Sequence, residues 1–190
     1  IVMMKRTALA LMVFCLPLLA SADADKVKLT EEGKGVIKAF FGDLKGELVK
    51  GMKSGGPVHS IDVCQKIAPS LAEAHSQKSG WRVARTSLKT RNPQNAPDVW
   101  ETEVLKQFED RKATGEDPMK IVKTEIVEEN GRKVFRMMKA IPTAEVCTKC
   151  HGTDIQAPVV EKLDELYPDD KARGYSVGDL RGAFTLKKTL

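Results

Sequence analysis

Residues 121–141 read IVKTEIVEENGRKVFRMMKAI and predict a β-hairpin. Asn130-Gly131 is the dipeptide preferred in tight two-residue turns, and it separates two stretches rich in β-branched and aromatic residues. Two antiparallel strands, 121–129 and 132–141, should therefore lie side by side. The register that this turn sets brings opposite charges together on two pairs and apolar side chains on a third: Glu128 with Lys133, Glu125 with Arg136, and Ile126 with Phe135.

Before the hairpin the sequence predicts three helices. Thr30 is a candidate N-cap for a first helix over residues 31–52, which residues 54–57 (SGGP) should end. A second helix is expected over residues 58–75, with a kink or break at Pro69. A third amphipathic helix should cover residues 98–111.

Two further strands are expected at residues 80–88 and 179–187. Strands that include a hairpin, with helices packed to one side, predict an α+β domain with an antiparallel sheet. The 190 residues, 42% of them hydrophobic, suit one globular domain rather than a disordered chain. The formal net charge is +5, and the basic residues are interleaved with acidic ones. The chain therefore has no basic block that would favour nucleic acid as a partner.

Residues 1–22 resemble a secretory signal peptide. Lys5 and Arg6 precede an apolar run over residues 8–20, and Ala20-Ser21-Ala22 has the small-x-small pattern of a cleavage site. The alternative, an uncleaved anchor, is disfavoured because the run is short for a bilayer. We therefore expect a mature domain over residues 23–190, located in a bacterial periplasm with no stable membrane insertion.

The segment Cys147-Thr148-Lys149-Cys150-His151 has the C-x-x-C-H pattern by which c-type haem is attached. The two thiols would form thioethers with the vinyl groups of one porphyrin, and His151 would ligate the iron from the proximal side. A covalent link retains the cofactor in an exported protein. The sequence thus predicts one covalently attached haem c.

Three other roles of paired cysteines, a zinc site, a redox dithiol and a disulfide, fit this segment less well than haem attachment. A structural zinc site needs four ligands, and the chain has no second C-x-x-C pair. A thioredoxin-like dithiol usually lies within a βαβ unit, which is not predicted around this motif. A disulfide is a third alternative, but Cys15 lies in the leader, so three cysteines remain and one of them would stay unpaired.

The ligand on the other side of the iron is less clearly indicated. Coordination chemistry alone favours a histidine, whereas core packing is the ordinary role of a buried methionine. Cys64 has a separate argument, because a bond to iron would protect a free thiol in an exported protein. The other candidates are His59, His75, Met52, Met119, Met137 and Met138.

Four segments of the chain resemble the PAS-like, c-type haem-binding sensor domain family found in periplasmic regions of bacterial signalling proteins. They are residues 61–69 (IDVCQKIAP), 85–101 (RTSLKTRNPQNAPDVWE), 147–152 (CTKCHG) and 175–183 (YSVGDLRGA). The resemblance implies a PAS-like fold, with Cys64 as the distal axial ligand and His151 as the proximal one. Many members of that family are fused to an output domain, whereas this chain ends at Leu190, so any signal should pass through a partner protein.

We expect the haem to lie between the sheet and the helix that carries Cys64, with Arg85, Arg91 and Arg181 as candidates to neutralise its propionates. Ligation by Cys64 and His151 would fill both axial positions, which predicts redox function or electron transfer with an unidentified redox or signalling partner. The alternative is a redox or gas (CO/NO) sensor in which Cys64 leaves the reduced iron. We expect no enzyme activity, because a peroxidase would need an open iron site.

Overall fold

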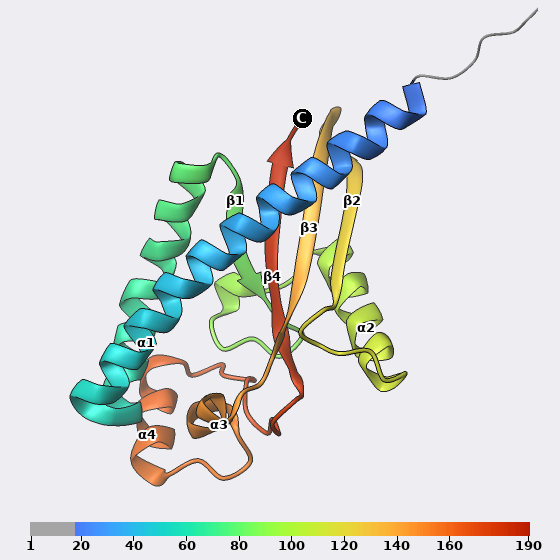
Figure 1. The fold of residues 1–190 in the computed structure, drawn as a ribbon. Helices are drawn as coiled ribbons and strands as arrows, with labels where there is room; N and C mark the ends of the chain where they lie inside the picture. Colours follow the sequence, from blue (N-terminus) through green and yellow to red (C-terminus); the bar gives the residue numbers. More distant parts are fainter. Residues whose placement is uncertain (1–17) are drawn as a thin grey trace, which may run out of the picture.

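The longest element of the computed structural model, which describes residues 18–190, is helix α1 (Leu18–Ser79). Its backbone is non-helical at Gly55 and at Gly56, where φ is 69°. The helix therefore forms two arms, and the second returns alongside the sheet after the first has crossed it (Figure 1). The break expected at residues 54–57 is thus confirmed.

Two details expected of α1 are wrong. Thr30 is not an N-cap, because the helix continues upstream of it and its hydroxyl donates a hydrogen bond to the carbonyl of Lys26. Pro69 does not break the second arm, whose backbone is helical on both sides of it. A proline lacks only one backbone donor, and packing of the arm against neighbouring elements compensates for that loss.

Four strands form one antiparallel sheet in the order β1-β4-β3-β2. Their bounds are Arg82–Thr86 for β1, Val122–Glu129 for β2, Arg132–Pro142 for β3 and Leu180–Thr189 for β4. The hairpin β2–β3 has the predicted register, with Glu128 facing Lys133, Ile126 facing Phe135 and Glu125 facing Arg136. Asn130 and Gly131 both have positive φ, 53° and 72°, as a tight turn of this type requires.

The remaining helices are short. Helix α2 (Val99–Ala113) begins at Asp98, whose carboxylate accepts from the backbone N–H of Glu101 in a capping box. A 3₁₀ turn, η1 (Pro93–Asn95), lies in the proline-containing loop before it. Helices α3 (Glu145–His151) and α4 (Ala157–Leu166) lie between β3 and β4, and neither was predicted as a helix.

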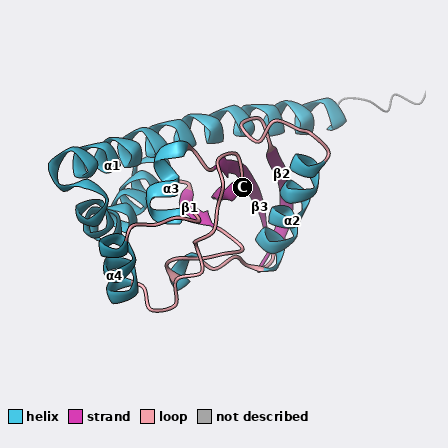
Figure 2. Ribbon diagram, turned by 90° about the horizontal axis from the view of Figure 1, so that it is seen from below, coloured by secondary structure: helices cyan, strands magenta, loops and turns pink. Residues whose placement is uncertain are grey.

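Alternate side chains of the strands point to opposite faces, and each face has its own core. On one face Phe135, Met137 and Leu186 pack against the first arm of α1. On the other face Met138 and Ala183 pack against α2. Viewed from below, α1 runs along one side of the sheet while α4 and α2 lie at opposite ends (Figure 2). The fold is therefore α+β with an antiparallel sheet, as predicted. The expectation that the helices pack to one side is wrong, because α1 covers one face of the sheet and α2 covers the other.

The expected signal peptide, residues 1–22, falls mostly outside the described residues, and so does Cys15; residues 18–22 form the start of α1. In the part of the chain that is described, no helix has both the length and the apolarity needed to span a bilayer.

Gly182 lies where β4 approaches the end of β1. Its φ is 153°, and a Cβ at this position would collide with the carbonyl oxygen of Thr86. We expect Gly182→Ala to lower the free energy of unfolding by about 1–3 kcal/mol, since both the backbone and the contact would be strained. Urea denaturation measures this change. Gly35→Ala is the matched control: a Cβ there meets no atom, so the substitution should stabilise α1 by about 0.5–1 kcal/mol. Equal stability of the two variants would contradict the prediction.

Candidate functional site

Helix α3 carries the C-x-x-C-H motif at the lower end of the sheet. The helix spans Glu145–His151, so Cys147, Cys150 and His151 stand at positions i, i+3 and i+4 and share one face. Gly152 ends the helix, and a Cβ at that position would be too close to the carbonyl of Thr148. The local sequence thus aims both thiols and the imidazole to the same side.

The imidazole of His151 is held by its Nδ1 atom. Nδ1 lies 2.7 Å from the carbonyl oxygen of Ala172 and 3.1 Å from Nε of Arg181. The carbonyl accepts from Nδ1 in the tautomer that leaves the lone pair on Nε2, whereas the N–H of Arg181 donates toward Nδ1 in the other tautomer. Burial, followed by the charges of Arg181 and Arg91, lowers the pKa of His151 well below its ordinary value. The ring is therefore neutral, with Nε2 able to ligate a metal in the first of these tautomers.

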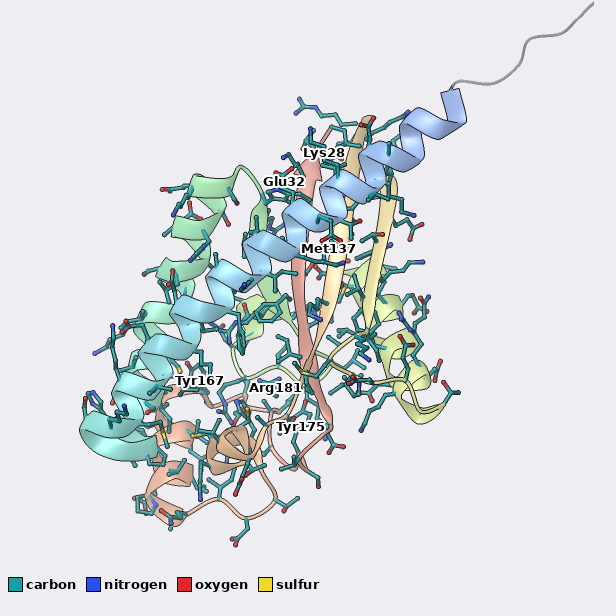
Figure 3. All side chains as sticks on the ribbon, in the orientation of Figure 1. Lys28, Glu32, Met137, Tyr167, Tyr175 and Arg181 are labelled. Atoms are coloured by element: carbon teal, nitrogen blue, oxygen red, sulfur yellow. The ribbon has the colours of Figure 1, made fainter. Side chains whose placement is uncertain are left out.

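The segment between α4 and β4, residues 167–179, is called the strap here, and it fixes the end of the motif. The N–H of Tyr175 donates to the carbonyl of His151 at 2.9 Å, and that of Gly174 donates to Gly152 at 2.9 Å. Figure 3 shows Tyr175 and Arg181 beside α3 at the lower end of the sheet. The strap supplies the Ala172 carbonyl as well, so it fixes the position of the His151 ring.

Arg91 ties the strap to the motif. Its Nη2 donates to the carbonyl of Cys150 at 2.6 Å and lies 3.1 Å from the carboxylate of Asp170, while Nη1 lies 3.4 Å from Nε2 of His151. Burial alone would raise the pKa of Asp170, but hydrogen bonds from Arg91, Arg173 and the Ala172 N–H hold it below its ordinary value. Asp170 therefore stays ionised and anchors Arg91.

Cys64 lies in the second arm of α1, on the same side of the molecule. Burial raises the pKa of its thiol, and the charges of Arg85 and Arg91 oppose that effect. Burial also raises the pKa of Cys150, as does the nearby thiol of Cys64. The second arm packs against α3 and α4 through a cluster formed by Ile61, Val159 and Leu163, into which Cys150 fits. The fold thus brings the predicted residue Cys64 to the C-x-x-C-H motif.

The three predicted arginines all reach this site. Arg85 lies near Cys64 and the phenol of Tyr167, and burial lowers its pKa. Arg181 contacts His151 and the ring of Tyr175. Asp170 pairs with Arg91 and Arg173, whereas no ion pair within residues 24–190 involves Arg85 or Arg181. The site is therefore rich in positive charge.

The other candidate ligands lie elsewhere or have other partners. His59 is exposed, and His75 pairs with Asp43 across the two arms of α1, with 2.8 Å between Nε2 and Oδ2. Met137 and Met138 are fully buried in the two cores, and Met119 is 62% exposed. Met52, also in α1, lies a few residues before the break between the arms. Among the described residues, no hydrogen bond, ion pair or core cluster joins these side chains to the motif.

Two contributors to the site were missed by sequence reasoning. Asp170 and Tyr167 follow α4, in a segment whose polar sequence shows no periodicity. Their roles depend on Arg91 and Cys64, which come from distant parts of the chain. The one local feature that indicates a helix before this segment is Pro158, which lies in the first turn of α4, where a helix tolerates proline.

Fold and site together define an α+β domain in which a C-x-x-C-H helix lies near an unpaired cysteine and a cluster of arginines. The sequence model of the Tll0287-like family matches residues 17–188, so the chain belongs to that family. The fold is similar to that in the crystal structure of the cyanobacterial heme-protein Tll0287, with a TM-score of 0.60 and 24% identity over 84% of this chain and 94% of that chain. A search of the curated proteins finds no match.

Proposed function

We propose that this chain is an exported, periplasmic c-type monohaem protein that serves in electron transfer or redox response. Cys147 and Cys150 would hold the haem through thioethers, and His151 and Cys64 would be its axial ligands. The observation that carries the proposal is the neutral His151, whose Nδ1 lies 2.7 Å from the carbonyl of Ala172 and which shares helix α3 with the half-buried thiols of Cys147 and Cys150. The structural relative is a cyanobacterial heme-protein, which supports the proposal.

The charges at the site fit this group. Arg85, Arg91 and Arg181 lie at the site with one buried carboxylate, Asp170, so positive charge exceeds negative charge among them. The two propionates of a haem would balance this excess through charge-assisted hydrogen bonds. The sheet order and the helices on both faces are also in keeping with a PAS-like domain, which we propose as the finer fold class.

Haem bound here would supply a one-electron Fe(III)/Fe(II) couple. The chain's own residues hold and orient it: the carbonyl of Ala172 fixes the imidazole, and Arg91 fixes the backbone of Cys150. Cys64 would add an anionic ligand, which favours the ferric state. With both axial positions filled by side chains, we propose no enzymatic role.

A redox or gas sensor is the second candidate. The observation that favours it is the location of Cys64 on the second arm of α1, which joins the long first arm at Gly55 and Gly56. If Cys64 is released from the ferrous iron, movement of the second arm would change its angle to the first arm at Gly55 and Gly56, and a partner protein would detect that change. Binding of CO by the reduced protein would support this function, and an unchanged spectrum on adding CO would contradict it.

Substitution of Cys64 tests the ligand set. We expect ferric wild-type protein to give low-spin optical and electron spin resonance spectra, and Cys64→Ala to give a high-spin or differently ligated form, because one axial donor is lost. Cys64→Ser serves as a second variant in case the alanine protein folds poorly.

The matched control is His59→Ala, since His59 is exposed and lies outside the site, and its spectrum should equal that of the wild type. Identical low-spin signals in wild type and Cys64→Ala would remove Cys64 from the iron.

A further inference from the structure

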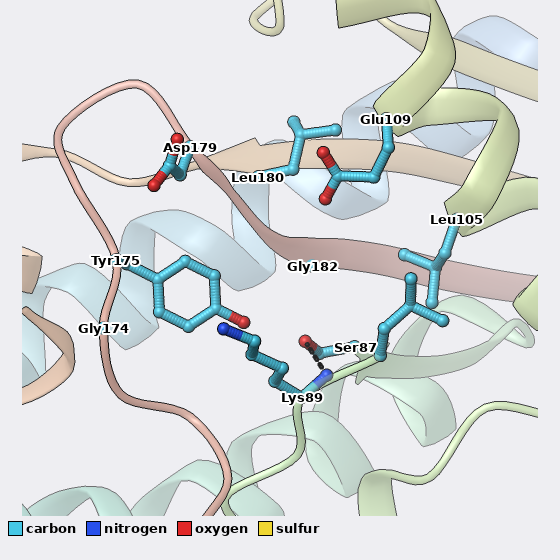
Figure 4. Close-up of a pocket in the computed structure, with 10 residues that line it drawn as sticks. Ser87, Lys89, Leu105, Glu109, Gly174, Tyr175, Asp179, Leu180 and Gly182 are labelled. Carbon is cyan, nitrogen blue, oxygen red and sulfur yellow. Dashed lines mark hydrogen bonds between the residues drawn. The ribbon is translucent and has the colours of Figure 1, made fainter. Parts of the chain in front are cut away.

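A cavity lies between the loop after β1, helix α2 and the start of β4. Its volume is about 230 Å³, and Leu88, Leu105 and Leu180 form its apolar walls (Figure 4). This is smaller than the ~300–1,000 Å³ of pockets that take drug-sized ligands. The polar lining residues are Ser87, Lys89, Glu109, Tyr175 and Asp179.

Three of these polar groups form no hydrogen bond or ion pair in the described structure, although Lys89 and Glu109 are exposed and the amine of Lys89 lies over the ring of Tyr175, 5.2 Å from its centroid. The hydrogen bond drawn among the lining residues joins the N–H of Lys89 to Oγ of Ser87, so the amine of Lys89, the carboxylate of Glu109 and the hydroxyl of Tyr175 are left without one there. Tyr175 is only 7% exposed, and its hydroxyl points into the cavity (Figure 4). Asp179, by contrast, already accepts from Lys112 and from the N–H of Ser176.

The cavity is distinct from the proposed haem site. The ring of Tyr175 lies edge-on to that of His151, with 6.4 Å between centroids, and Arg181 lies over it. Arg181 approaches Nδ1 of His151, whereas the ligating atom is Nε2. The cavity thus lies behind His151, away from the thiols of the motif.

The charges are separated in a way that fits a dipolar ligand. Lys89 and Glu109 line the same cavity without forming an ion pair in the described structure. Lys89 and the Tyr175 hydroxyl offer donors to a carboxylate, and Glu109 offers an acceptor to an ammonium group. Burial raises the pKa of Glu109, and a cation beside it would offset that effect.

We propose that this cavity binds a small zwitterion of the α-amino acid class. The ligand's carboxylate would contact Lys89 and Tyr175, its ammonium group would contact Glu109, and its side chain would pack on the leucines. Through Tyr175 and Arg181 such a ligand would lie next to the residues that hold His151. This inference concerns a second ligand and stands independently of the proposed function.

Isothermal calorimetry on the full chain, carrying its cofactor as purified, tests the site with L-leucine as the probe. Two analogues separate the charges: 4-methylpentanoate lacks the ammonium group, and 3-methylbutylamine lacks the carboxylate. We expect each analogue to bind at least about tenfold more weakly than leucine, because each leaves one charged group unpaired. No heat with leucine up to about 10 mM, or equal binding of all three, overturns the proposal.

Variants test the assignment of residues. Lys89→Ala and Glu109→Gln should each weaken leucine binding by about tenfold or more. The controls are Lys53→Ala and Glu103→Gln, which remove exposed charges of the same sign outside the cavity and should leave binding unchanged. Wild-type affinity in both cavity variants overturns the proposal. Haem absorption, read on the same samples, reports on the proposed function separately.

Discussion

Cys147→Ala/Cys150→Ala is expected to abolish covalent attachment of haem. Wild-type protein, produced in a periplasm with a working c-type maturation system, should have the mass of the polypeptide plus one haem. The double variant should have the mass of the bare polypeptide, because no thiol remains on the face of α3 to form a thioether. Mass spectrometry of the denatured protein measures the difference.

Cys64→Ala is the matched control for this experiment. This variant also loses a thiol, but Cys64 lies in α1 rather than in the motif. Covalent haem should therefore remain at the wild-type level. A wild-type protein with the mass of the polypeptide alone, or with two hydrogens fewer, would contradict the proposal. The second of these masses would instead indicate a disulfide.

Arg136→Met is expected to cause the largest loss of stability. The guanidinium of Arg136 is 3% exposed and lies 2.7 Å from the carboxylate of Asp98, 3.1 Å from Glu129 and 3.4 Å from Glu101. It also stacks over the ring of Trp100 at 4.2 Å. Methionine would fill much of the space but leave the buried carboxylate of Glu101 without a cation. Asp98 and Glu129, by contrast, are more exposed and keep Lys187. The expected loss in the free energy of unfolding is about 3–5 kcal/mol.

Urea denaturation checks the size of this effect. Lys106→Met is the control, because Lys106 pairs with Glu103 on the exposed side of α2 and should contribute about 0–1 kcal/mol. Arg136→Lys should fall between the two, since lysine keeps the charge but loses the planar contacts. If Arg136→Met were as stable as Lys106→Met, the cluster would not be needed for the fold.

The sheet could be predicted from the sequence because its signals are local. The Asn130-Gly131 turn fixed the register of the hairpin, and Gly55-Gly56 fixed the break in α1. The capping role of Thr30 was wrong for a different reason. A cap pattern needs a chain that is not already helical, and α1 already runs through residues 18–29, where several alanines, leucines and lysines favour a helix even though residues 24–28 are exposed.

The site was predictable only in part. The spacing of Cys147, Cys150 and His151 indicated their chemistry, and Arg91 stood out in a loop framed by prolines. The carbonyl that orients His151 and the carboxylate that holds Arg91 come from the strap after α4. Backbone carbonyls leave no trace in a sequence, and contacts between distant segments arise only when the chain has folded.

The position of β4 between β1 and β3 has a consequence for biosynthesis. The strand made last fills the middle of the sheet, and its pairing partners include Arg82, far earlier in the chain. Edge strand β2 can pair with β3 in the local hairpin before β4 is made, whereas β1 has no partner in the sheet until β4 is present. Deletion of β4 should therefore separate β1 from the hairpin, and formation of the complete sheet depends on contacts between distant parts of the chain.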